Sequence, residues 1–196
     1  MAKTPFSTHL DNWLKSSKPK TLEGLVNNFE EKSFAILFLV LMALPALPLP
    51  TGGLTHLFEL ITVLLALEVI AGRRSVWLPK RWRGMNLPKS VVNSGLPKLV
   101  SFIAWLEKYS RPRFSQLMSH RFTLQILGLV IIVFAVFAAF AIPFSGLDTL
   151  PALGIVLIAL SIILEDFLLM LVGILVGSVG VGLVIGLGSA AFKLLG

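Results

Sequence analysis

The hydrophobic residues of this chain fall in long continuous runs rather than in an alternating pattern. Five apolar segments cover residues 33–49, 54–72, 122–142, 147–164 and 167–192. A helix needs about 20 apolar residues to cross a hydrocarbon core, and most of these runs approach that length. The pattern therefore predicts an all-α, polytopic helical membrane protein. It excludes a transmembrane β-barrel, whose strands alternate apolar and polar residues.

The polar regions at 1–32 and 73–121 carry 16 of the 17 basic residues. The positive-inside rule places both regions, and with them the N-terminus, in the cytoplasm. The sequence then divides into five parts: a cytoplasmic amphipathic segment (1–32), a first membrane hairpin (33–72), a basic cytoplasmic or interfacial segment (73–121), a second hairpin (122–164) and a glycine-rich membrane helix (165–196).

Two stretches in the polar regions repeat apolar residues at helical spacing. They are Leu22, Leu25, Val26 and Phe29, and Leu99, Phe102, Ile103 and Leu106. Basic amphipathic helices of this kind lie along the headgroup layer of a membrane. The alternative is that they pack on each other as a small cytoplasmic cap.

Composition strengthens the membrane assignment and excludes several kinds of chemistry. The chain is 56% hydrophobic and 14% charged, whereas soluble domains are roughly a quarter charged. It has no cysteine, and its three histidines are scattered, so no metal site and no cofactor are expected. There is no paired nucleophile and base and no phosphate-binding glycine loop, which argues against an enzyme. The basic residues border the membrane, so nucleic-acid binding is not expected.

The two hairpins resemble each other when the sequence is shifted by 93 residues. Ten identities fall within 30 residues, and the shared Pro-x-x-Gly-Leu motif places Pro50 and Gly53 opposite Pro143 and Gly146. These four residues are predicted to form the hairpin tips. Secondary transporters are often built from such repeats, with the substrate site between them. The charge distribution favours two hairpins of the same orientation, while an inverted pair and re-entrant hairpins remain alternatives.

Four polar residues in or beside the apolar runs form a candidate intramembrane polar or ion site: His56, Glu59, Glu68 and Asp148. A charge within the membrane costs several kcal/mol unless it is paired or faces water. His56 lies one helical turn before Glu59, on the same face. The alternative is that the carboxylates lie near the interface or bond to a neighbouring helix, and that Asp148 caps a helix.

The repeat register also aligns two cations of one hairpin with two anions of the other. Arg73 and Arg74 fall near Glu165 and Asp166, which predicts ion pairs between the repeats. Such pairs can form a gate or a headgroup site, or simply fix the packing of the hairpins.

The last apolar run carries small residues at helical spacing, including Gly173, Gly177, Gly182 and Gly186. Such a face lets helices approach closely. It can pack inside one molecule or form a homo-oligomer contact.

Several short motifs follow one another in a characteristic order. In chain order they are Leu44-Pro45, Leu49-Pro50, Ala71-Gly72-Arg73-Arg74-Ser75-Val76-Trp77-Leu78-Pro79, Ser110-Arg111-Pro112-Arg113, Thr149-Leu150-Pro151-Ala152-Leu153 and Leu164-Glu165-Asp166. Together they resemble the ExoD family of bacterial exopolysaccharide synthesis proteins.

The resemblance implies a protein of the bacterial inner membrane with a role in exopolysaccharide synthesis, and it implies no catalytic residues. We expect a small transporter-like protein with a site between the repeats. The alternative is a non-catalytic component that scaffolds or regulates an exopolysaccharide assembly complex. The expected partners are the lipid bilayer, a second copy of the chain and exopolysaccharide assembly proteins.

Overall fold

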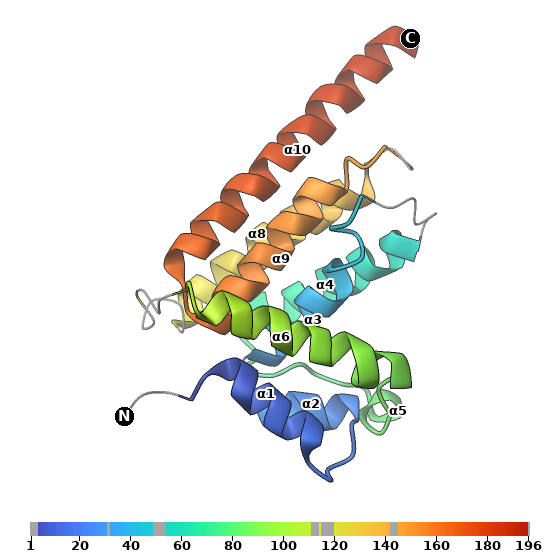
Figure 1. Cartoon of the computed structure of the whole chain (residues 1–196). Helices are drawn as coiled ribbons and strands as arrows, with labels where there is room; N and C mark the ends of the chain where they lie inside the picture. The colour runs from blue at the N-terminus through green and yellow to red at the C-terminus, as the bar shows by residue number, and fades with distance from the viewer. Residues whose placement is uncertain are drawn as a thin grey trace.

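The computed structural model of the chain describes residues 4–30, 32–48, 54–110, 114, 120–141 and 145–195 (Figure 1). Throughout these parts the regular elements are helices, and an isolated antiparallel bridge pairs Thr21 with Asn86. The predicted all-α class is therefore confirmed.

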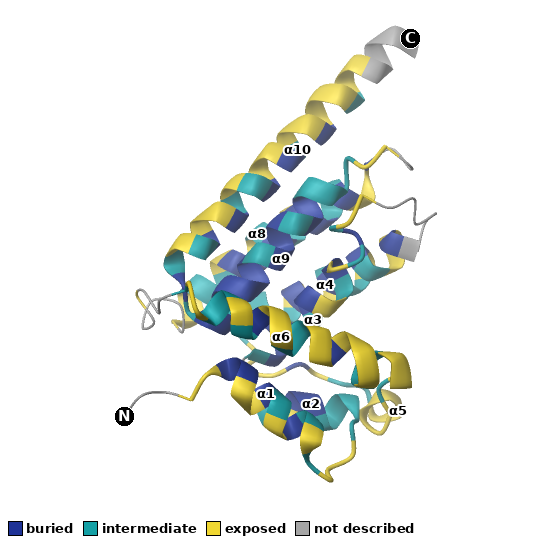
Figure 2. Ribbon diagram, viewed as in Figure 1, coloured by how far each residue is buried: buried dark blue, intermediate teal, exposed yellow. Residues whose placement is uncertain are grey.

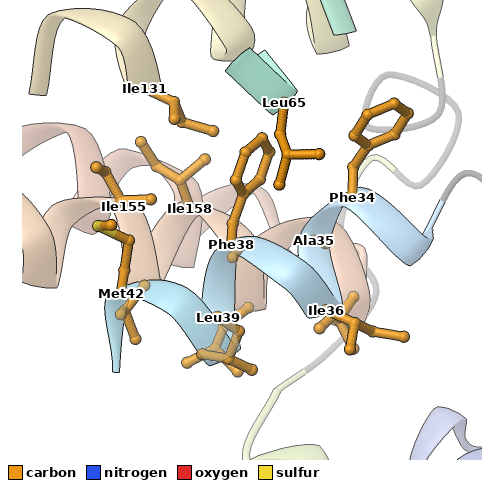
Figure 3. Close-up of a cluster of buried hydrophobic side chains, with 14 of the residues drawn as sticks. Phe34, Ala35, Ile36, Phe38, Leu39, Met42, Leu65, Ile131, Ile155 and Ile158 are labelled. Carbon is orange, nitrogen blue, oxygen red and sulfur yellow. The ribbon is translucent and has the colours of Figure 1, made fainter. Parts of the chain in front are cut away.

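The four helices of the two predicted hairpins form the central bundle. They are α3 (Lys32–Met42), α4 (Leu54–Ile70), α8 (Arg121–Ala139) and α9 (Thr149–Leu164). The closest pairings join α4 to α8 and α3 to α9, so each hairpin packs its first helix on the second helix of the other. Figure 3 shows the resulting core, in which Phe38 of α3 lies among Leu65, Ile131 and Ile158.

Hydrogen bonds bring the polar ends of both hairpins to one end of this bundle. Lys32, the first residue of α3, donates from Nζ to the carbonyl of Ile163 near the end of α9, at 2.9 Å. Gln125, early in α8, donates from Nε2 to the carbonyl of Ile70 at the end of α4, at 2.8 Å. The two hairpins therefore run in the same direction, as the charge distribution favours.

The first helix of the first hairpin is shorter than its apolar run. The run extends to residue 49, but α3 ends at Met42 and turns follow. Pro45 explains the end, because proline has no amide N–H and clashes with the preceding helical turn. At 1.5 Å per residue α3 is about 16 Å long, whereas a hydrocarbon core is about 30 Å thick.

Among the described residues, two helices are long and apolar enough to cross a membrane, judged by length and composition. They are α8, over Arg121–Ala139, and the last helix, α10 (Phe167–Leu195), over Phe167–Ala190. Both correspond to apolar runs of the sequence. By contrast α4 and α9, with 17 and 16 residues, are each about 25 Å long.

Glycines allow α10 to pack tightly against α9. A Cβ atom on Gly154 of α9 would lie 2.6 Å from the Cα atom of Gly177, and one on Gly180 would lie 2.5 Å from Pro151. Past this contact α10 continues away from the bundle, and its outer part is largely exposed (Figures 1 and 2).

The two polar regions form a helical layer at the basic end of the bundle. It contains α1 (Phe6–Lys15), α2 (Leu22–Phe29), α5 (Lys80–Arg83) and α6 (Leu96–Glu107), with a π-helical turn at Val91–Gly95 before α6. Hydrogen bonds from the Ser7 amide and hydroxyl to the Glu107 carboxylate join α1 to α6. Leu25 and Ile103 are buried in it, so both amphipathic stretches contribute to a cap. Phe102 and Trp105 of α6 nevertheless stay exposed.

Candidate functional site

Three of the four predicted intramembrane polar residues come together in the structure. His56 Nδ1 lies 2.9 Å from Glu59 Oε2, and the Glu59 side chain is almost completely buried. Asp148 is near enough to act electrostatically on Glu59. Glu68 is separate, because it lies near the other end of α4 and accepts a hydrogen bond from the amide of Trp77 at 2.7 Å.

Glu59 belongs to a buried polar stripe along α4. Thr55, Glu59 and Thr62 are all buried and share one helical face, while Leu60 and Leu64 of the same helix are exposed. Glu59 Oε1 and Thr62 Oγ1 have no hydrogen-bond partner in the described parts of the chain. Thr62 was not identified from the sequence, although its position three residues after Glu59 indicates that the two share one helical face.

This face of α4 is directed at the second hairpin. Ala66 lies seven residues after Glu59 and therefore on the same face, and it is fully buried. Its carbonyl oxygen would lie 3.2 Å from a Cβ atom on Gly128 of α8. The absence of a side chain at Gly128 thus lets the two helices approach closely.

The predicted cap at Asp148 does not form. Asp148 precedes α9, but its side chain makes no capping hydrogen bond. Its backbone has helical angles, φ −69° and ψ −24°, whereas a capping residue normally has extended ones.

A second feature lies at the basic end of the bundle, where helices from both hairpins meet around a cavity of about 280 Å³. Its floor is apolar and includes Phe34, Phe38, Leu127, Ile131 and Ile162. Its rim is polar and consists of three arginines, Arg73, Arg74 and Arg121, together with His120. We call it the arginine-rimmed cavity.

The end of α4 places two of these rim residues. Gly72 has φ +74°, its amide donates to the Val69 carbonyl, and the Arg73 amide donates to the Glu68 carbonyl at 3.1 Å. This is a Schellman motif, in which glycine adopts the left-handed conformation that ends the helix. Arg121 packs directly on the turn, since a Cβ atom on Gly72 would lie 2.5 Å from Arg121 Nε.

The predicted ion pairs between the repeats do not form between the residues named. Glu165 pairs with Lys32 at 3.1 Å, and Asp166 accepts from the Ser110 hydroxyl at 2.8 Å. Arg73 instead lies over the Trp77 ring, 5.6 Å from its centre. The reason is the helix pairing: the end of α9 lies beside the start of α3, so a lysine of the first hairpin reaches Glu165.

The hairpin tips are only partly described, because Pro50, Gly53 and Pro143 lie outside the described residues. Gly146 has φ +70°, which is a left-handed conformation suited to a turn before α9.

The glycines of α10 divide into two groups. Gly173 and Gly177 pack inside the molecule, whereas Cβ atoms on Gly182 and Gly186 would meet no atom within 4 Å. The first half of the predicted small-residue face therefore packs inside the molecule, and the half at Gly182 and Gly186 makes no such contact.

No solved structure matches the chain. The family described as "Exopolysaccharide synthesis, ExoD" matches residues 6–186. An uncharacterised protein of Synechocystis is 30% identical over 156 residues, which cover 76% of this chain and 71% of that protein. Protein ExoD of Rhizobium meliloti is 31% identical over 153 residues, covering 76% of this chain and 62% of that relative. With a match over nearly its whole length, the chain belongs to the ExoD family.

Proposed function

We propose that this chain is a multi-pass protein of the bacterial inner membrane that serves exopolysaccharide synthesis as a small, non-enzymatic, transporter-like protein. The family description and the Rhizobium relative support the link to exopolysaccharide. The apolar character of α8 and α10 supports the membrane location. The basic ends of both hairpins meet at one end of the bundle, which supports a cytoplasmic N-terminus.

The single observation that carries the transport role is the buried carboxylate of Glu59. An ionised carboxylate in apolar surroundings is costly unless it is paired or hydrated. Here one oxygen is bound to His56 and the other has no partner in the described part of the chain. Such a group is suited to take up and release a proton or a small cation.

His56 links this carboxylate to the surface. Its side chain is 45% exposed, while that of Glu59 is 1% exposed. The pair therefore forms a polar connection from the outside of α4 to the interface between the hairpins, where a transporter of repeated design holds its site.

The test is ion flux in proteoliposomes, measured with an internal pH dye and with cation-sensitive dyes. The Glu59→Gln variant keeps the size and a hydrogen-bonding group but cannot carry a negative charge, so we expect flux to be lost. Glu68→Gln is the matched control on the same helix and keeps flux. Wild-type flux from a folded Glu59→Gln protein would sink the proposal.

A scaffolding role is the second candidate, and the free part of α10 favours it. Gly182 and Gly186 have open space around them, and Leu183 and Leu187 nearby are exposed. This surface suits a second copy of the chain or a membrane helix of an assembly protein. The test is co-purification in mild detergent, with loss of the partner in a Gly182→Leu, Gly186→Leu variant. Recovery of the chain alone as a monomer counts against this role.

A further inference from the structure

The arginines of the arginine-rimmed cavity, Arg73, Arg74 and Arg121, have no acidic partner among the residues that the structure describes. Two lysines differ from these arginines in this respect, since Lys15 is paired with Asp11 and Lys32 with Glu165. Guanidinium groups bind phosphate oxygens through parallel hydrogen bonds, so this rim is chemically matched to a phosphate.

His120 adds a donor to the same rim. Its Nδ1 accepts a hydrogen bond from the amide of Phe122 at 3.3 Å, which places the ring proton of the neutral form on Nε2. The residue is also the N-cap of α8, where the partial positive charge of the helix dipole favours an anion.

The floor of the cavity has the opposite character. Phe34, Phe38, Leu127 and Ile131 are buried apolar residues, and they lie directly beneath the cationic rim. A hydrophilic anion alone gains little from this floor, and a neutral apolar molecule gains little from the rim. The ligand that satisfies both is an anion attached to an apolar chain.

The position of the cavity fits a lipid. It lies where the apolar run of α8 begins, which is the level of the headgroups if α8 crosses the membrane. Trp77, which stacks with Arg73, is exposed at this level, as tryptophans at membrane interfaces are.

We propose that the arginine-rimmed cavity binds a phosphate-bearing lipid, with its phosphate at Arg73, Arg74 and Arg121 and its chain along Phe34 and Phe38. This goes beyond the proposed transport role and does not depend on Glu59. The site lies in the half of the bundle opposite the His56–Glu59 pair, since it is formed by the end of α4 rather than its start.

The experiment measures ligand binding to the purified full chain in neutral detergent, by titration calorimetry and native mass spectrometry. The probes are dioctanoyl phosphatidic acid, dioctanoylglycerol and inorganic phosphate. We expect phosphatidic acid to bind saturably and at least tenfold more tightly than either other probe. The variants Arg73→Gln and Arg74→Gln should each weaken it at least tenfold. Arg81→Gln changes an exposed arginine of α5 outside the cavity. It is the matched control and leaves binding unchanged.

Arg121→Gln is a further variant, but Arg121 also packs on Gly72. The exposed Arg74 therefore supplies the safer test. Equal affinity of wild type and the Arg73 and Arg74 variants overturns the proposal. Inorganic phosphate or dioctanoylglycerol binding as tightly as phosphatidic acid overturns it too. A protein that binds phosphatidic acid but carries no flux overturns the transport role alone, and flux without binding overturns this inference alone.

Discussion

Lys32 Nζ lies 3.1 Å from Glu165 Oε1 and joins the first residue of α3 to the residue that follows α9. The same ammonium group donates to the Ile163 carbonyl at 2.9 Å and lies 5.4 Å from the centre of the Phe6 ring. Glu165 has a left-handed backbone, φ +55°, which ends α9. One lysine therefore connects the cap, the first hairpin and the second hairpin.

We expect Lys32→Met to destabilise the protein. The side chains of Lys32 and Glu165 are 31% and 15% exposed, so the pair is partly shielded from water. Losing a hydrogen bond that involves a charged group costs about 1.5–3 kcal/mol. The measurement is thermal unfolding in detergent. Lys15→Met is the control, because its pair with Asp11 is exposed and contributes little. Equal losses of stability in the two variants would show that the Lys32 contact stabilises the protein no more than an exposed ion pair does.

Gly154→Ala tests the packing of α9 on α10. The new Cβ atom would lie 2.6 Å from Cα and 2.8 Å from N of Gly177, and backbone atoms cannot move aside as a flexible side chain does. Overpacking of this kind costs about 1–3 kcal/mol. Gly182→Ala on the free part of α10 meets no atom within 4 Å, so its stability should be unchanged or higher. An unfolding temperature for Gly154→Ala at or above that of Gly182→Ala contradicts the tight contact.

The positions of the helices along the sequence were easier to predict than the contacts between them. The start of α10 follows from Glu165-Asp166, because the Asp166 side chain accepts a hydrogen bond from the Leu168 amide at 3.0 Å. The end of α3 was missed because hydropathy continues past Met42 and only Pro45 marks the break. The ion pairs were misassigned because the repeat register compares positions in sequence and does not say which helices touch.

The candidate site was predictable where its residues share one helix. The spacing of His56 and Glu59 indicated their contact, and the structure has it at 2.9 Å. The arginine-rimmed cavity was not predictable as a cavity, since its lining extends from Phe34 to Ile162 and depends on how four helix ends converge. The need for glycine at position 154 was not predictable either. It arises from the close approach of the Gly177 backbone, which belongs to a separate helix.

The His56–Glu59 pair predicts non-additive stability. In His56→Ala the Glu59 carboxylate loses its hydrogen-bond partner at Oε2 yet stays buried, so we expect a loss of about 1–3 kcal/mol. In the double variant with Glu59→Gln the buried charge is gone, and much of that loss should be recovered. Unfolding of the wild type, both single variants and the double variant gives the coupling. Additive effects would mean that the two side chains do not depend on each other.

Gly72→Ala tests whether the turn after α4 positions the cavity rim. Alanine is strained at φ +74°, and its Cβ atom would displace the Arg121 guanidinium, so we expect a loss of about 1–2 kcal/mol in stability. Phosphatidic acid affinity should fall with it, because one rim cation moves. Gly84→Ala is the matched control in the same basic segment: Gly84 has φ −79°, and its Cβ atom would have open space. If both variants match the wild type in unfolding and in binding, Gly72 does not hold Arg121 at the rim, and the rim depends on the arginines alone.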